Sequence, residues 1–96
     1  MKSINRKGLR YMEKEEVRAS LAALIEEEMP ELEAVEMNKN IVSEYGINSV
    51  SIIRLIVAAE TQYDIEFSDY ELDLDGYVTF EDLAAVIKDK LDKKED

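Results

Sequence analysis

A chain of 96 residues, 46% of them hydrophobic and 36% charged, is long enough for one folded domain and too apolar to be disordered. Its formal charge of −11 repels nucleic-acid phosphates and anionic membrane surfaces, so we expect neither as a partner. The sequence has no cysteine and no histidine, which removes disulfides, the commonest zinc ligand and Cys–His or Ser–His catalysis. We therefore predict a protein that is not an enzyme.

The charge is distributed unevenly along the chain. Residues 1–10 hold four basic residues and no acid, so the other 86 residues hold 8 basic against 23 acidic residues. We interpret residues 1–10 as a basic N-terminal tail and residues 11–96 as the folded domain. Neither part contains an apolar run typical of a signal peptide or a transmembrane helix. We expect a cytoplasmic monomer.

The first element that the pattern predicts is a helix within residues 11–29, which Pro30 ends. Its apolar residues recur at helical spacing: Val17, Leu21, Leu24, Ile25 and Met29. From Glu31 to Ile47 the periodicity breaks up although apolar residues persist. This predicts a long loop attached to the core, and loops of that length are usually functional or mobile.

A second helix is predicted from Asn48 and Ser49, both good N-cap residues, through Tyr63, because residues 50–63 contain no Gly or Pro. At 100° per residue, this helix has two apolar sides. One side, which we assign to the core, consists of Ile52, Leu55, Ile56, Ala59 and Tyr63. The opposite side includes Val50, Ile53, Arg54 and Val57, and we predict that these four residues form a docking face for partner proteins.

The remaining chain predicts a connecting region over residues 64–78, with a short helical turn capped by Ser68, and then a last helix. Thr79 and Asp82 have the spacing of a capping box at the start of that helix. The predicted fold is all-α, a small four-helix bundle of three main helices and one short helix. Its predicted core includes Val17, Leu21, Leu24, Leu55, Ala59, Phe67, Leu83 and Ile87.

The segment Gly46-Ile47-Asn48-Ser49-Val50 resembles the acyl and peptidyl carrier protein family. In that family a Gly-x-Asp-Ser-Leu segment opens the second helix, and its Ser receives phosphopantetheine from coenzyme A. Residues 60–67 and 79–83 resemble the same template, so the likeness spans about Val17 to Leu91. Asn48 stands where the family usually has Asp, and Val50 replaces the usual Leu. The resemblance implies that Ser49 carries a covalent 4′-phosphopantetheine arm and that Asn48 caps the helix beside it.

Physical chemistry favours a Ser at this position independently of the family. A helix N-terminus carries unpaired N–H groups and about half a positive charge, so it stabilises an anionic phosphodiester. With no cysteine in the chain, the thiol of the arm has no internal competitor for an acyl group.

The resemblance implies a freestanding carrier that holds an acyl or aminoacyl group as a thioester. It also implies three kinds of partner: a phosphopantetheinyl transferase, an adenylating or acyl-ligating enzyme, and downstream biosynthetic enzymes. Arg54 lies where carriers of the fatty-acid type tend to be acidic. The likeness there is to carriers of nonribosomal-peptide or specialised acyl pathways.

Two alternative hypotheses remain open from the sequence. Residues 71–82 resemble a calcium-binding EF-hand loop, with acids at Glu71, Asp73, Asp75 and Asp82 and a glycine at the sixth place. The segment departs from the EF-hand pattern at both ends: Glu71 stands where the pattern has Asp, and Asp82 stands where it has Glu. The other alternative is an unmodified helical module that binds proteins through the same docking face.

Overall fold

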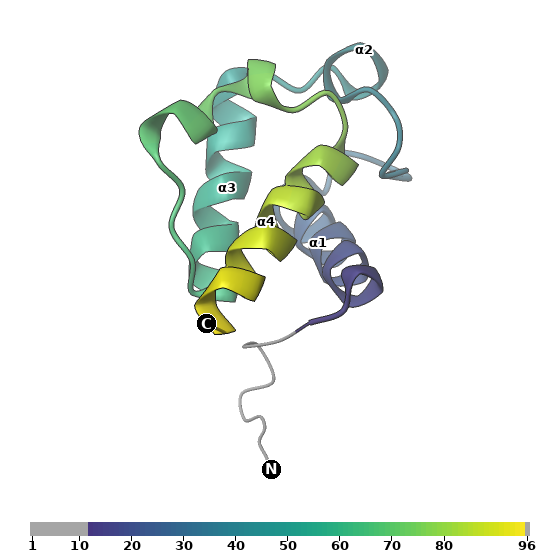
Figure 1. Ribbon diagram of the computed structural model, residues 1–96. Helices are drawn as coiled ribbons and strands as arrows, with labels where there is room; N and C mark the ends of the chain where they lie inside the picture. The colour runs from purple at the N-terminus through teal and green to yellow at the C-terminus, as the bar shows by residue number, and fades with distance from the viewer. Residues whose placement is uncertain (1–11, 96) are drawn as a thin grey trace.

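The computed structural model describes residues 12–95, and within them three long helices pack around one core (Figure 1). These are α1 (Lys14–Glu28), α3 (Ser49–Tyr63) and α4 (Phe80–Glu95), and α1 packs against both of the others. A short helix, α2 (Ile41–Tyr45), and two 3₁₀ turns, η2 (Asp69–Leu72) and η3 (Leu74–Gly76), lie in the connections. The predicted all-α bundle with three main helices is confirmed; the short helical turn predicted after Ser68 is η2, whereas the short helix α2 was not predicted. The basic tail predicted for residues 1–10 lies outside the described residues.

The helix α1 begins at Lys14, somewhat later than the periodicity predicted, because Glu13 has an extended backbone and caps it. The Glu13 N–H donates to the Glu16 carboxylate at 2.8 Å, and the Glu13 side chain accepts from the Glu16 backbone in return. At the other end, the Met29 N–H donates to the Ile25 carbonyl (2.8 Å), one residue before Pro30. Local capping therefore sets both ends of α1.

The prediction of an uninterrupted loop from Glu31 to Ile47 is wrong, because α2 lies within it. Asn40 caps α2 through its side-chain oxygen, which accepts from Val42 N–H (2.9 Å) and Ser43 N–H (2.8 Å). Gly46 ends α2 in the left-handed conformation, with φ at 65°. A helix of five residues is too short for helical periodicity to reveal it.

The connections on either side of η2 and η3 follow the capping pattern of the sequence. Ser68 caps η2, and its N–H and hydroxyl both donate to the Glu71 carboxylate at 2.8 and 2.9 Å. The predicted Thr79–Asp82 capping box is also confirmed, by bonds of 3.2 Å and 3.3 Å. The sequence therefore predicted the caps at the starts of η2 and α4.

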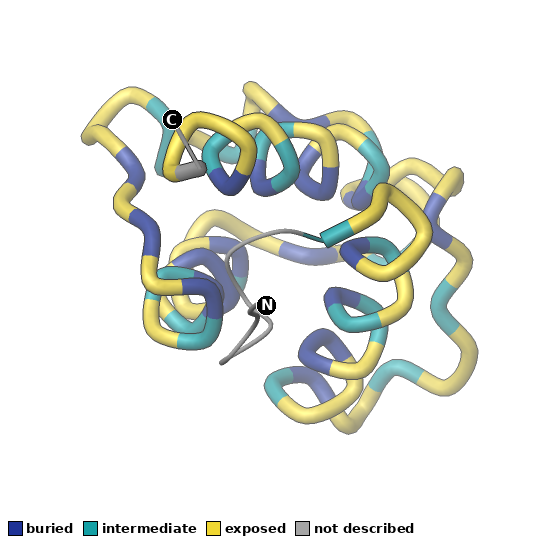
Figure 2. The backbone as a smooth tube through the Cα atoms, turned by 60° about the horizontal axis from the view of Figure 1, so that its bottom comes forward, coloured by how far each residue is buried: buried dark blue, intermediate teal, exposed yellow. Residues whose placement is uncertain are grey.

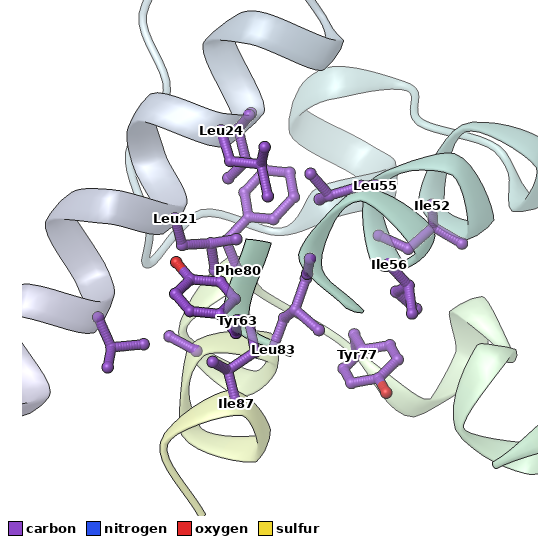
Figure 3. Packing of buried hydrophobic residues seen from close by; sticks show 14 of the residues in the cluster. Leu21, Leu24, Ile52, Leu55, Ile56, Tyr63, Tyr77, Phe80, Leu83 and Ile87 are labelled. Atoms are coloured by element: carbon purple, nitrogen blue, oxygen red, sulfur yellow. The ribbon is translucent and has the colours of Figure 1, made fainter. Parts of the chain in front are cut away.

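All eight predicted core residues are buried, and together with their neighbours they form one cluster. Figure 2 shows buried and exposed positions alternating along each helix, and Figure 3 shows side chains of α1, α3 and α4 meeting in the centre. The two predicted sides of α3 are confirmed: Ile52, Leu55 and Ile56 are fully buried, whereas Val50 and Val57 are 67% and 49% exposed. No helix in the described residues is long and apolar enough to cross a membrane.

The two sides of α3 should respond differently to truncation. Ile56→Ala should lower the free energy of unfolding by about 2–5 kcal/mol, because it removes a fully buried side chain and leaves a cavity. Val57→Ala, one residue further on, should change it by no more than about 0.5 kcal/mol, since Val57 is half exposed. Urea denaturation followed by circular dichroism measures both values. Equal losses in the two variants would contradict the assignment of the faces.

Candidate functional site

Ser49 is the first residue of α3, and its side chain is exposed. Asn48 precedes it with an extended backbone and caps the helix: its side-chain oxygen accepts from the Ser51 N–H at 2.9 Å. The first helical hydrogen bond runs from the Ile52 N–H to the Asn48 carbonyl (3.1 Å). The Ser49 hydroxyl therefore stands at the positive end of a well-formed helix, within reach of a partner molecule.

The chain that leads into Ser49 is anchored although Ser49 itself is exposed. Ile47, two residues before it, is 6% exposed, and Ile52, three residues after it, is fully buried. Gly46 makes the turn out of α2 with its N–H bonded to carbonyls of Ile41 and Val42. Any other residue at Gly46 would be strained by the left-handed φ, even though a Cβ there would meet nothing within 4 Å. The attachment of these flanking residues to the core holds Ser49 in place.

The first three turns of α3 differ in charge from the rest of this acidic chain. The first turn of α3 contains no acidic residue, and residues 48–59 contain Arg54 as their one charged side chain. Arg54 is exposed and makes no ion pair with any described residue. The partial positive charge of the helix N-terminus, with no acid in the first turn and a cation after it, favours an anionic group at this end of α3.

The four residues of the predicted docking face lie directly beside Ser49. Val50, Ile53 and Val57 are 67%, 38% and 49% exposed, and Arg54 is exposed between them. Their helical spacing places them on one side of α3, away from the buried face. We refer to Val50, Ile53, Arg54 and Val57 as the α3 strip.

The carboxylates of the EF-hand-like segment serve separate local turns. The Asp73 carboxylate accepts from the Asp75 N–H (3.0 Å), and the Asp82 carboxylate accepts from Val78 N–H at 2.8 Å. The hydrogen bond from the Ser68 N–H, together with Lys90 of α4, holds the pKa of Glu71 below its ordinary value. Among residues 12–95 no group of three or more His, Cys, Asp or Glu side chains could hold a metal ion. The geometry thus gives the calcium hypothesis no support.

Comparison with known proteins identifies the class of this chain. A family model described as "Phosphopantetheine attachment site" matches residues 15–87, a range that covers α1 from its second residue, all of α3 and the first half of α4. The chain therefore belongs to the family of phosphopantetheine-binding carrier proteins. It is similar to an acyl carrier protein of Kocuria rhizophila, with 35% identity over 60 residues that make up 62% of this chain and 74% of the relative. No solved structure matches it.

Membership of this family implies a covalently attached 4′-phosphopantetheine, and the start of α3 fits such a group. Its phosphodiester is anionic, and the exposed Ser49 hydroxyl lies at a helix N-terminus whose first turn contains no acidic residue. Asn48 retains the capping oxygen that the family's usual Asp would supply, and it adds no negative charge beside the phosphate.

The sequence interpretation missed the way in which α2 supports this site. The Ile41 N–H donates to the Val78 carbonyl at 2.8 Å, and Asn40 forms an antiparallel bridge with Thr79. These contacts fix α2, and through Gly46 the segment before Ser49, to the start of α4. The cap Asn40 and the glycine six residues later were the available signals for α2, but no local signal pointed to Val78.

The capping role of Asn48 can be tested by substitution. Asn48→Ala should lower the free energy of unfolding by about 1 kcal/mol because the Ser51 N–H loses its acceptor. Asn48→Asp keeps an acceptor and places a negative charge at the helix N-terminus, so it should be as stable as the wild type or about 0.3–1 kcal/mol more stable. Urea denaturation gives these values, with Asn38→Ala, an exposed loop position, as the control. If Asn48→Ala matched Asn38→Ala, the cap would contribute nothing.

Proposed function

We propose that Ser49 is the attachment residue for the phosphopantetheine arm. The observation that carries this proposal is the exposed Ser49 hydroxyl at the N-terminus of α3, in a helix start that Asn48 caps and whose first turn contains no acidic residue. In the loading step the Ser49 hydroxyl attacks the phosphorus of coenzyme A that bears the pantetheine. A new bond to Ser49 Oγ forms as the pyrophosphate bond breaks, the hydroxyl proton passes to a base of the transferase, and adenosine 3′,5′-bisphosphate leaves.

The proposed protein holds substrates for other enzymes and performs no catalysis itself. The arm supplies a terminal thiol, on which an acyl or aminoacyl group is held as a thioester. The partners are then a phosphopantetheinyl transferase, an adenylating or acyl-ligating enzyme that charges the thiol, and biosynthetic enzymes that use the tethered group. The absence of cysteine supports this function, because every other thiol on the chain would compete for the cargo.

Substitution of Ser49 tests the attachment proposal. After incubation with coenzyme A and a broad-specificity phosphopantetheinyl transferase, the wild-type protein should gain one arm by mass spectrometry and one thiol by titration. Ser49→Ala should gain neither, because it lacks the attacking hydroxyl. Ser51→Ala, a serine in the same helical turn, should still be modified. A thiol acquired by Ser49→Ala would refute the assignment, and an unmodified wild-type chain would favour the alternative of a plain interaction module.

We further propose that the α3 strip is the docking face for the partner enzymes. A partner must bring its active site to the end of the arm, and the strip begins at the residue next to Ser49. Val50, Ile53 and Val57 offer apolar surface that has no partner within the described bundle. Arg54 adds a cation without an ion pair, which favours a partner with an acidic counterpart and disfavours basic docking patches.

Two substitutions test the docking proposal. Val57→Ala and Arg54→Glu should leave the melting temperature nearly unchanged because both side chains are exposed. Each should slow charging by the cognate enzyme, by up to about 30-fold if the residue is a central anchor worth about 2 kcal/mol. Val42→Ala, a 53% exposed valine of α2 outside the strip, is the matched control. Unchanged charging in both variants, or unfolding of Val57→Ala, would rule the strip out.

A further inference from the structure

The side-chain amide of Asn48 has two ends, and the cap of α3 uses one of them. Its oxygen accepts from the Ser51 N–H at 2.9 Å, so the other end of the planar amide is the NH2 group. This group can donate two hydrogen bonds, and it donates none to any residue that the structure describes. Because Asn48 is exposed, the NH2 group is available to an acceptor from outside the chain.

The two residues after Asn48 leave further donors open at the same end of α3. In the first turn of a helix, the N–H groups have no acceptor within the helix. Asn48 provides one for Ser51, whereas the N–H groups of Ser49 and Val50 donate to no described residue. Three consecutive residues, 48–50, therefore have open N–H donors next to the Ser49 hydroxyl.

Membership of the carrier family supplies an acceptor that suits these donors. Phosphopantetheine is attached through a phosphodiester, which carries a negative charge and whose oxygens only accept hydrogen bonds. On Ser49 this group would be attached one residue from the Asn48 amide. A hydrogen bond to an ionised acceptor is roughly twice as strong as one between neutral groups. The phosphodiester is thus the kind of ligand that the open amide can bind.

The usual Asp of the family could not make this contact. A carboxylate only accepts hydrogen bonds, and it carries a charge of the same sign as the phosphodiester. It would cap α3 as Asn48 does, but it would repel the first group of the arm. Since Asn and Asp have nearly the same shape, the exchange alters the donor and the charge and little else.

We propose that Asn48 is a positioning residue for the arm: its oxygen caps α3, while its NH2 group donates a hydrogen bond to the phosphodiester on Ser49. This inference rests on the attachment of the arm to Ser49 proposed above. Together with the N–H groups of Ser49 and Val50, the Asn48 amide holds the first group of the arm at the helix N-terminus. The arm then leaves α3 from a fixed point next to the α3 strip.

Amide resonances of the loaded and unloaded protein test the hydrogen bond directly. The chain is loaded from coenzyme A by a broad-specificity transferase, and mass spectrometry verifies the arm. On loading, the NH2 signals of Asn48 should move downfield and exchange more slowly with solvent. Asn40 is the internal control, because its oxygen caps α2 in the same way and no serine follows it. Its NH2 signals should not move.

The two proposals fail in distinguishable ways in this experiment. A wild-type chain that gains no arm would contradict attachment to Ser49 and the present inference with it. A loaded chain whose Asn48 signals do not move would overturn the present inference and leave the attachment standing.

Melting temperatures of substituted proteins separate the donor from the charge. Loading should raise that of the wild type by about 2–6 °C, because an anion is then bound at a helix N-terminus. Asn48→Ser keeps a capping oxygen without the NH2 group and should show a smaller rise. Asn48→Asp should show no rise or a fall, although its unloaded form is at least as stable as the wild type. Asn40→Asp, the same exchange at the cap of α2, should rise as the wild type does. No rise in the wild type, or an equal rise in either Asn48 variant, would overturn the inference.

Discussion

The burial of one face of α3 is the constraint on which the rest of the structure depends. Ile52, Leu55 and Ile56 are fully buried, so a rotation of α3 by one residue would bring apolar side chains into water and move Arg54 toward the core. With the helix fixed in this orientation, its opposite side must be exposed. The position of Ser49 at the exposed start of α3 and the exposure of the α3 strip are therefore consequences of core packing.

Contacts between distant segments add a second level of organisation around the same helix. The bond from Ile41 to Val78 joins α2 to the start of α4, and Tyr77 lies directly beside that bond in the chain. The hydrogen bond between Ile41 and Val78 therefore helps to hold both the segment that leads into Ser49 and the buried ring of Tyr77.

Acidic residues are absent from the first three turns of α3 and are frequent elsewhere in the chain. The chain has a net charge of −11, yet residues 48–59 include no acid, so the start of α3 is suited to a phosphodiester. Elsewhere the acids stabilise turns: Glu71 and Asp82 accept backbone N–H groups at the starts of η2 and α4. The acids of residues 71–82 have a spacing similar to that of an EF-hand loop. Three of them, Glu71, Asp73 and Asp82, instead accept hydrogen bonds from backbone N–H groups.

The sequence by itself determined the features that depend on neighbours in the chain. Helical periodicity predicted the three long helices and the two sides of α3, and the pair Asn48 and Ser49 predicted where α3 begins, because capping and helical phase are local. Only the tertiary structure decided the place of α2 and the burial of Tyr77. Both depend on bonds between residues far apart in sequence, such as Ile41 with Val78, and no local pattern encodes which distant carbonyl a given N–H will meet.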